Sequence, residues 1–460
     1  MSRVVVVGAG LSGLAAGVLL GERAPSLEVR VFDAADRAGG AVGTVEMGGF
    51  RVERGADGFL TEKPAALELA TRLGVGDRVI RTQPATHGAF VVRDGALLPL
   101  PKGFTMMAPV DLGEFLRSKV LSPAGKLRAA AEVLAPRRCP EDDESLGSFV
   151  RRRFGRELLE RLAQPLAAGI YGADPDRLSL RATMPRFLQE ERRMGSVTLG
   201  LRERAKRGGV DARGVRYGLF ASFDHGMQVL IDAAVARLGE RLRLGAPVTS
   251  LTTTADGVAL EVGGERVTAD AVVLALPGPA LARLVGPVDP DLGARIGAIP
   301  HGSCATVTFG WDAPAVDPRF DGYGFVVPKI EGRPSMAATF LSKKWAGRAP
   351  PGSELARVFL PGEPSSDDEA VAIAAAELRA LAGVTRAPTI TRVQRYARAM
   401  PIYEVGHETR AKEIAAAASA RTPRVLLAGN SLFGVGIPDA VRSGEAAALA
   451  ALTALGQRSG

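Results

Sequence analysis

The sequence has few cysteines, few histidines and few aromatic residues. Among 460 residues there are only two cysteines, Cys139 and Cys304, and four histidines, and no CxxC motif is present. Two distant cysteines do not make a disulfide framework, and a zinc site needs several Cys or His ligands close together, so we expect no disulfide and no metal. Aromatic residues make up 5% of the chain and are not interleaved with its basic runs, so no nucleic-acid partner is expected.

Long apolar runs are also missing. No stretch approaches the ~18 uninterrupted apolar residues of a membrane-spanning helix. Glycines interrupt the apolar N-terminus and the acidic stretch VFDAAD soon follows, unlike a secretory signal. We therefore expect a soluble cytoplasmic protein, and its length predicts two or more domains. The net charge of +8 indicates either acidic partners or simply an Arg-rich, solvated surface, and both interpretations stay open.

The order of the predicted elements indicates an α/β (α+β) fold. Residues 3–7 and 27–32 form predicted strands on either side of a helix at about 12–22, and residues 424–455 repeat this strand, glycine-loop and helix plan. Residues 109–205 instead form amphipathic helices with basic polar faces. Strand patterns return over 241–276 and 300–362. The helical stretch is therefore predicted to be a subdomain inserted between strand-rich parts.

The glycine-rich turn after the first strand, Gly8-Ala9-Gly10-Leu11-Ser12-Gly13, predicts a dinucleotide site. Its glycines permit a tight turn and bring backbone close to a diphosphate, which then lies at the N-terminus of the helix. Asp33 ends the next strand, 20 residues after Gly13, where an acid binds a ribose hydroxyl and disfavours the 2′-phosphate of NADP. This turn alone does not distinguish NAD from FAD.

Three further stretches favour FAD. Arg37-Ala38-Gly39-Gly40 follows the second strand, where flavoproteins of the glutathione-reductase superfamily return under the cofactor and an arginine can meet a phosphate. VERGADGFL (52–60) brings more glycines to this region. The last stretch, Gly429 to Ile437, places backbone N–H groups and a helix N-terminus where a reduced flavin would carry negative charge.

With these motifs, the chain resembles the amine-oxidase-like flavoprotein superfamily and, within it, the porphyrinogen oxidases of haem biosynthesis. The resemblance is discontinuous but covers nearly the whole chain. Its most specific stretch is GIYGAD followed by LSLRA, and the others are ERGADGFL, SLGSFVRRRFG, FDHGMQVLIDA, AMPIYEVGH and GVGIPDAVRSGEAA.

The resemblance implies three structural parts and a set of ligand-binding residues. A Rossmann-like FAD-binding domain would comprise residues 1–90, 215–278 and 390–460, a mixed-sheet substrate domain 91–108 and 279–389, and a helical subdomain 109–214. The residues implied to bind FAD, without a covalent bond, are Gly8, Ala9, Gly10, Leu11, Ser12, Gly13, Asp33, Ala34, Arg37, Gly39, Gly40, Ala41, Gly55, Ala56, Asp57, Gly58, Val248, Tyr396, Asn430, Val435, Gly436 and Ile437. The substrate would contact Gly169, Ile170 and Phe359.

The implied reaction is an O2-dependent, six-electron oxidation of a porphyrinogen to a porphyrin. In this family the flavin N5 accepts hydride from a methylene bridge, O2 reoxidises the flavin, and no side chain is an obvious catalytic acid or base. We therefore assign no catalytic residue. The scarcity of histidines agrees with this mechanism.

Two substrates stay open. Some relatives use an arginine for a substrate propionate where this chain has Ala89, whereas Lys63 matches a lysine of bacillus-like enzymes that act on coproporphyrinogen III. Four propionates would suit Lys63 and the positive net charge, so we favour coproporphyrinogen III over protoporphyrinogen IX. Lys63 could equally be a solvated loop residue.

Other functions are less well supported by these motifs. Amine oxidases share the cofactor domain but often carry a cysteine near the C-terminal loop, and GNSLFGVGIPDA has none. Carotenoid desaturases lack GIYGAD, and a non-enzymatic flavin-binding scaffold does not need motifs at both chain ends. The basic helices 109–205 either pack on the rest of the protein or contact the inner face of the cell membrane. A partner enzyme of the haem pathway and the oligomeric state are left open.

Overall fold

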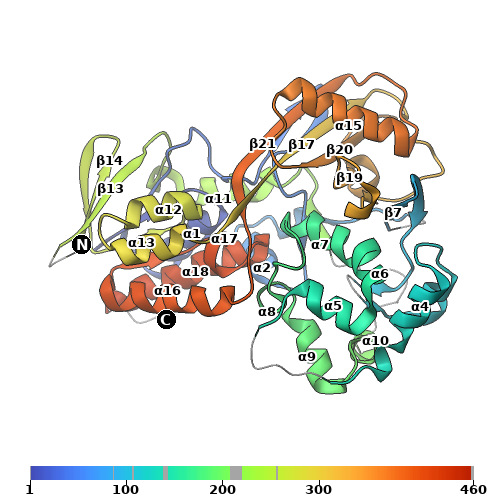
Figure 1. The fold of residues 1–460 in the computed structure, drawn as a ribbon. Coiled ribbons are helices and arrows are strands. Elements are labelled where there is room, and N and C mark those ends of the chain that lie inside the picture. The colour runs from blue at the N-terminus through green and yellow to red at the C-terminus, as the bar shows by residue number, and fades with distance from the viewer. Residues whose placement is uncertain are drawn as a thin grey trace.

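The computed structural model describes residues 2–85, 88–105, 108–137, 143–207, 220–254 and 257–456. Cys139 and the predicted boundary at residues 214–215 lie outside these ranges. The chain forms three lobes (Figure 1): one contains both ends of the chain, one is built on a large sheet, and one is helical. This arrangement agrees with the predicted α/β class and the inserted helical part.

The first lobe is built on a parallel sheet of five strands in the order β12-β2-β1-β16-β22. The strands are β1 (Arg3–Val7), β2 (Glu28–Phe32), β12 (Leu242–Arg243), β16 (Ala271–Leu274) and β22 (Val425–Leu427). Because successive side chains point to opposite faces, the valines of β1 enter two different cores. Val4 and Val6 pack on one side, and Val5 and Val7 on the other.

Helices cover both faces of this sheet, as a buried parallel sheet requires. One face carries α1 (Leu11–Arg23), α11 (Gln228–Leu238) and α18 (Ile437–Ala454). The other carries α12 (Gly278–Val285), α13 (Pro290–Gly297), α16 (His407–Arg421) and the sheet of β13 (Val248–Thr253), β14 (Val258–Val262) and β15 (Glu265–Ala269). Strand β1 lies between β2 and β16, so the carboxyl end of β1 is the topological switch point, where such folds bind ligands.

The second lobe is a seven-stranded mixed sheet in the order β21-β17-β20-β19-β18-β7-β8. Its strands are β7 (Phe90–Arg93), β8 (Ala96–Pro99), β17 (His301–Trp311), β18 (Gly324–Val326), β19 (Ala337–Phe340), β20 (Glu354–Pro361) and β21 (Ile390–Pro401). Helix α15 (Asp367–Ala382) packs on one face through a core that includes Val307 and Val358. The opposite face is turned toward residues 53–55 and forms one wall of the region beside them.

Smaller elements connect these lobes. They are β3 (Thr44–Met47), β4 (Phe50–Glu53), β5 (Phe59–Leu60), α2 (Ala65–Arg72), η1 (Gly76–Arg78), β6 (Val79–Arg81), β11 (Phe220–Phe223), η4 (Gly239–Arg241), η5 (Lys329–Glu331), α14 (Leu341–Lys344) and α17 (Asn430–Phe433). Residues 79–81 form β6, which pairs with β11.

Two segments differ from the predicted domain boundaries. Residues 390–401, grouped by sequence with the cofactor domain, form the edge strand β21 and pair with β17 along most of their length. Residues 279–297, grouped with the substrate domain, lie in α12 and α13, which pack against the parallel sheet. Strand pairing and helix packing depend on residues that are distant in the sequence, so the local pattern of these segments does not predict them.

The third lobe contains β9 (Phe104–Thr105), β10 (Ala108–Pro109), α3 (Leu112–Arg117), α4 (Pro123–Ala130), η2 (Ala131–Leu134), α5 (Leu146–Phe154), α6 (Arg156–Leu158), η3 (Leu159–Ala163), α7 (Gln164–Tyr171), α8 (Leu180–Thr183), α9 (Pro185–Met194) and α10 (Val197–Arg207). A fully buried ion pair, Glu132 with Arg153, lies at its centre. Glu132 also accepts hydrogen bonds from the Ser196 hydroxyl (2.7 Å) and the Val197 backbone N–H (2.9 Å), so one carboxylate joins η2, α5 and the start of α10.

Replacing this carboxylate with a neutral amide should destabilise the helical lobe. In Glu132→Gln the Arg153 guanidinium loses its nearest buried counter-ion and keeps the more distant Glu191 (3.4 Å), and losing one partner of a buried pair costs about 3 kcal/mol or more. Urea unfolding followed by circular dichroism measures the loss. The matched control is Glu160→Gln, which removes the partner of the exposed Arg156 and should leave the urea midpoint unchanged. Equal losses in both variants would contradict the prediction.

Candidate active site

The glycines of the first turn differ in the space around them. A Cβ at Gly13 would lie 1.8 Å from the Gly8 carbonyl oxygen, and a Cβ at Gly8 would lie 2.4 Å from that of Ala275, so both positions are closed by backbone. A Cβ at Gly10 meets no protein atom within 4 Å. Gly10 is the N-cap of α1, which no side chain caps within the described residues. The turn therefore leaves bare backbone facing open space at a helix N-terminus.

The second glycine pair lies directly against this turn. The Gly39 N–H donates to the Ala9 carbonyl (2.8 Å), and a Cβ at Gly40 would lie 3.2 Å from the Gly10 Cα. Both Gly39 (φ +98°) and Gly40 (φ +58°) have backbone angles that side-chain-bearing residues rarely adopt. Two loops without side chains thus form one cradle, which fits the diphosphate of a dinucleotide.

Asp33 lies at the end of β2, beside the cradle. Its carboxylate accepts hydrogen bonds from the backbone N–H groups of Ala9 (2.5 Å) and Ala35 (2.8 Å), so it also fixes the first turn. The backbone of Ala246 donates to the Asp33 carbonyl (2.8 Å), which brings the start of β13 and Val248 close to Asp33 and Ala34. The predicted ribose contact of Asp33 stays a prediction.

Three arginines gather next to the cradle. Arg37 donates to the carbonyls of Ala38 (3.0 Å) and Gly40, and both Arg37 and Arg54 approach Gly43. Burial and the charge of Arg54 lower the pKa of Arg37, and the same two causes lower the pKa of Arg392 on β21. Cations that disfavour one another in this way would be stabilised by an anion such as a phosphate. Arg37 was predicted from the sequence, whereas Arg54 and Arg392 were not.

Two buried arginines, Arg357 on β20 and Arg348 between α14 and β20, hold residues 53–55. The buried Arg357 of β20 donates to the carbonyls of Gly55 (2.6 Å) and Glu53 (2.7 Å). Arg348 pairs with the buried Glu53 carboxylate at 3.1 Å, and burial raises the pKa of Glu53 despite this partner. These contacts fix the backbone of the loop that the resemblance implies to lie under the flavin.

The Asp57 side chain is bound by other residues of the protein. Its carboxylate accepts from Lys344 Nζ (2.9 Å) and Trp345 Nε1 (3.0 Å). Burial alone would raise the pKa of Asp57, but Lys344, Arg357 and these hydrogen bonds hold it at about 2. The Asp57 side chain is therefore committed to α14, which leaves its backbone for the predicted flavin contact.

The loop from Gly55 to Gly58 is closely packed on its neighbours. A Cβ at Gly55 would lie 2.1 Å from the Ala41 carbonyl oxygen, and one at Gly58 would lie 2.6 Å from that of Ala221. Ala56, between them, is exposed. The loop thus lies against Ala41 at the end of the Gly39-Gly40 turn, so these predicted cofactor residues form one continuous backbone surface.

The C-terminal glycine unit meets the N-terminal one. Ser12 Oγ lies 3.4 Å from Ser443 Oγ, and a Cβ at Gly444 would lie 1.9 Å from the Ser12 carbonyl oxygen. Leu11 and Ser12 are buried at this contact. The Tyr403 hydroxyl accepts from the Gly434 N–H (2.7 Å) and donates to the Asn430 carbonyl, which fixes the loop before Val435, Gly436 and Ile437.

Three of the four predicted substrate residues lie in two places: Phe359 is on the face of the large sheet opposite α15, and Gly169 and Ile170 are in α7 of the helical lobe. Phe359 lies two residues from Arg357 and therefore on the same sheet face, which is turned toward residues 53–55. On this face Tyr396 also donates its hydroxyl hydrogen to the Arg54 carbonyl. Ile170, near the end of α7, is exposed.

Lys63 is already paired in the structure. Its ammonium lies 2.6 Å from an Asp439 carboxylate oxygen in the first turn of α18. Burial and the Asp439 charge raise the pKa of Tyr171, which follows Gly169 and Ile170, and Val435 packs on the core of the helical lobe. The structure therefore brings Lys63, the end of α7 and the C-terminal glycine unit into one region around Asp439.

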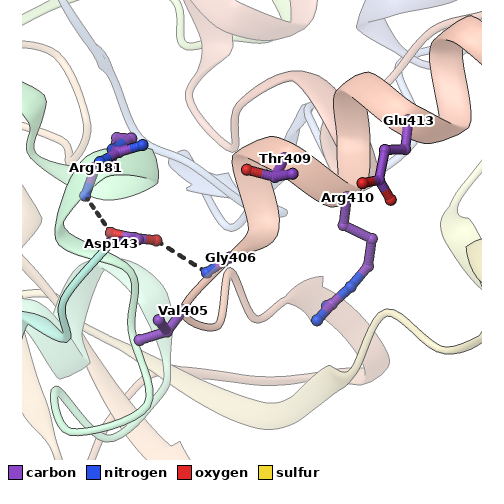
Figure 2. Close-up of a pocket in the computed structure, with 7 residues that line it drawn as sticks. All are labelled: Asp143, Arg181, Val405, Gly406, Thr409, Arg410 and Glu413. Carbon is purple, nitrogen blue, oxygen red and sulfur yellow. Dashed lines mark hydrogen bonds between the residues drawn. The ribbon is translucent and has the colours of Figure 1, made fainter. Parts of the chain in front are cut away.

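A pocket of about 500 Å³ lies apart from these residues, between α8 and α16 (Figure 2). Asp143 accepts hydrogen bonds there from the backbone N–H groups of Gly406 (2.9 Å) and Arg181 (3.3 Å), and Arg410 and Glu413 complete its charged lining. Such a charged lining does not fit the apolar ring system of a porphyrinogen. None of the predicted site residues lines it.

Comparisons with known proteins agree with this arrangement. The model of the flavin containing amine oxidoreductase family matches residues 11–452, so the chain belongs to this family of flavoproteins. Coproporphyrinogen III oxidase from Bacillus subtilis (strain 168) is 34% identical over 471 residues, covering 98% of this chain and 98% of that protein. Within the family, the chain belongs with the porphyrinogen oxidases.

Two further relatives support this placement. Chloroplastic protoporphyrinogen oxidase from Nicotiana tabacum is 28% identical over 94% of this chain and 82% of that protein. A crystal structure of an Exiguobacterium sp. 255-15 protein assigned as a protoporphyrinogen oxidase has a TM-score of 0.87 and 31% identity, covering 99% of both chains. No helix in the described parts of the chain has both the length and the apolarity to cross a bilayer.

Gly10→Ala should separate cofactor binding from folding. The added methyl group meets no protein atom within 4 Å, so the apoprotein should fold normally, yet it would occupy the predicted diphosphate cradle. We expect FAD affinity to fall about tenfold or more, since close backbone approach to the diphosphate is lost. Titration of the apoprotein by FAD fluorescence quenching measures it.

The control is Gly297→Ala at the end of α13, where the nearest neighbour of the new Cβ is the Ala282 Cβ at an ordinary 3.5 Å. This variant should keep normal FAD affinity. Unchanged affinity in Gly10→Ala would show that no cofactor group lies on Gly10.

Proposed function

We propose that this protein is an FAD-dependent, O2-using oxidase that converts coproporphyrinogen III to coproporphyrin III in haem biosynthesis. The observation that carries the proposal is that Ser443 links the two glycine units, Gly8–Gly13 and Gly429–Ile437: its hydroxyl oxygen lies 3.4 Å from Ser12 Oγ and accepts from the Gly429 N–H (3.1 Å). The loop 53–58, which Arg357 holds, lies against Ala41 beside the first unit. The family membership and the similarity to the Bacillus subtilis enzyme support the same reaction.

FAD would be held without a covalent bond. The residues that fit its diphosphate are the Gly10 and Gly40 backbones and the arginines at 37, 54 and 392, with Asp33 on the ribose. No cysteine is present in the C-terminal loop 429–437. Cys304, on β17, has a thiol pKa raised by burial, so it carries little of the thiolate that covalent attachment needs.

When bound, FAD supplies the hydride acceptor, and the residues of this chain supply position and surroundings. Arg357 and Arg348 keep the loop 53–58 in place, while Phe359 offers an aromatic surface on the wall next to it. Catalysis of this kind depends on orientation rather than on a catalytic acid or base. We therefore propose no catalytic side chain.

The preference for coproporphyrinogen III rests on charge. This substrate carries four propionates and protoporphyrinogen IX two, and the chain has a net charge of +8 with Lys63 at the region around Asp439. The higher identity to the Bacillus subtilis enzyme, 34% against 28% for the tobacco protoporphyrinogen oxidase, points the same way. Protoporphyrinogen IX is the alternative substrate, with the same chemistry.

Anaerobic mixing tests the reaction and the substrate together. The purified holoenzyme should lose its flavin absorbance rapidly with coproporphyrinogen III, more slowly with protoporphyrinogen IX, and not with putrescine or benzylamine. Admitting O2 should restore the absorbance and yield peroxide and the porphyrin. Rapid bleaching by an amine together with none by either porphyrinogen would replace the proposal with an amine oxidase.

We also propose a cytoplasmic location with peripheral contact between the helical lobe and the inner face of the cell membrane. Leu116, Leu127 and Leu134 are exposed on the consecutive elements α3, α4 and η2, and Lys126 lies among them. In Figure 1, α4 lies at the outer edge of the helical lobe, far from the lobe that holds the chain ends. Exposed apolar side chains with nearby cations suit an anionic lipid surface.

Cosedimentation with phosphatidylglycerol-containing vesicles tests this contact. The double variant Leu127→Glu/Leu134→Glu should lose vesicle binding because it places two negative charges on the apolar patch. Leu449→Glu, which alters an exposed leucine on α18 in another lobe, should bind like the parent protein. An unbound parent protein, or equal binding by all three, would refute the membrane contact.

A further inference from the structure

Asp439 is a buried carboxylate shared by two exposed cations. One of its oxygens lies 2.6 Å from Lys63 Nζ and the other 2.9 Å from Arg442 Nη2. The Asp439 side chain is 6% exposed, whereas that of Lys63 is 56% and that of Arg442 is 67% exposed. The three side chains therefore present a net positive charge to solvent, with the negative charge behind it.

This group lies where the cofactor and substrate regions meet. Asp439 packs under the C-terminal glycine unit, since a Cβ at Gly434 would lie 2.6 Å from the Asp439 Cβ. Burial and the Asp439 charge also raise the pKa of both Tyr171, at the end of α7, and Tyr403. Lys63 reaches Asp439 from the turn between β5 and α2.

We propose that Lys63 and Arg442 form a two-cation subsite for one carboxylate side chain of the substrate, with Asp439 as the buried counter-ion that holds Arg442 and competes with the substrate for Lys63. The proposal rests on the proposed function, because it assumes a substrate that carries carboxylates. It adds Arg442 and Asp439 to the residues that recognise the substrate, and it explains why Lys63 is paired with Asp439 when no substrate is bound.

The two cations have different tasks in this subsite. Exposed ion pairs contribute little to stability, so Lys63 can turn from Asp439 toward an incoming carboxylate at small cost. A buried carboxylate left without a counter-ion would be unfavourable, but Arg442 keeps its contact with the other oxygen. Asp439 also lies in the first turn of α18, where the helix dipole favours a negative charge.

The same arrangement disfavours an amine substrate. An ammonium group approaching from solvent meets Lys63 and Arg442 first, while Asp439 lies behind them. Like charges repel, so this region selects anionic groups. The subsite therefore separates this chain from amine oxidases that share its fold.

Equilibrium binding of porphyrins to the holoenzyme tests the subsite without turnover. The ligands are coproporphyrin III, which carries four carboxylates, and its tetramethyl ester, which carries none. Lys63→Met should weaken coproporphyrin III about tenfold or more, as expected for a lost charge-assisted hydrogen bond, and Arg442→Met should weaken it as well. Neither variant should change binding of the ester.

Asp439→Asn gives a readout that a merely structural role would not produce. Removing the charge that competes for Lys63 should strengthen coproporphyrin III binding, provided the flavin absorbance shows that FAD is retained. Lys412→Met is the matched control: Lys412 is an exposed cation paired with Glu408 on α16, so its loss removes the same charge elsewhere. It should bind both ligands like the parent protein.

The results distinguish a failure of the two-cation subsite from a failure of the proposed function. Unchanged coproporphyrin III binding in Arg442→Met, or equal losses for the acid and the ester, would overturn the two-cation subsite. If Asp439→Asn loses FAD, the comparison of coproporphyrin III with its tetramethyl ester in Lys63→Met and Arg442→Met still tests the subsite. Failure of the parent enzyme to react with coproporphyrinogen III would instead overturn the proposed function, which the anaerobic experiment detects separately.

Discussion

The close backbone contact between α1 and α18 determines the geometry of the site. Gly444 lies so near the Ser12 carbonyl that a methyl group there would approach it to 1.9 Å, and Ser12 and Ser443 join across the same contact. Because these helices begin at the two glycine turns, their contact places both turns at the carboxyl end of β1. A cofactor site that combines turns from opposite ends of the chain therefore depends on this helix packing.

The large sheet has two roles in this protein. Its face opposite α15 offers Phe359 as part of a substrate wall, and Arg357 on that face holds the carbonyls of residues 53 and 55. Lys344, at the end of α14, pairs with Asp57 from the same side. The sheet face that would orient the substrate is thus bonded directly to the loop implied to contact the flavin. Hydrogen bonds from Arg357 and the ion pair of Lys344 with Asp57 fix the position of the loop relative to the sheet.

Local sequence patterns predicted the parts of this structure that are formed by glycine-rich backbone turns. The turn at Gly8–Gly13, its partner at Gly39-Gly40 and the repeated unit after β22 all follow from glycine spacing between a strand and a helix. The same patterns did not predict that Asp57 and Lys63 are already ion-paired, because Lys344 and Asp439 lie hundreds of residues away. The roles of Arg357 and Arg392 were missed for the same reason, since strand pairing across the large sheet decides which arginines face residues 53–55, and Arg348 reaches Glu53 from the segment between α14 and β20.

The discontinuous parallel sheet also constrains how the protein is made. Strand β1 pairs with β2 soon after both are synthesised, but its other partner, β16, lies more than half a chain later, and β22 later still. The Gly8–Gly13 turn therefore leaves the ribosome long before α18 exists to complete the cradle. The first βαβ unit therefore stays without its later sheet and helix partners until α18, the last helix of the described residues, is released, so the two glycine units come together only at the end of synthesis.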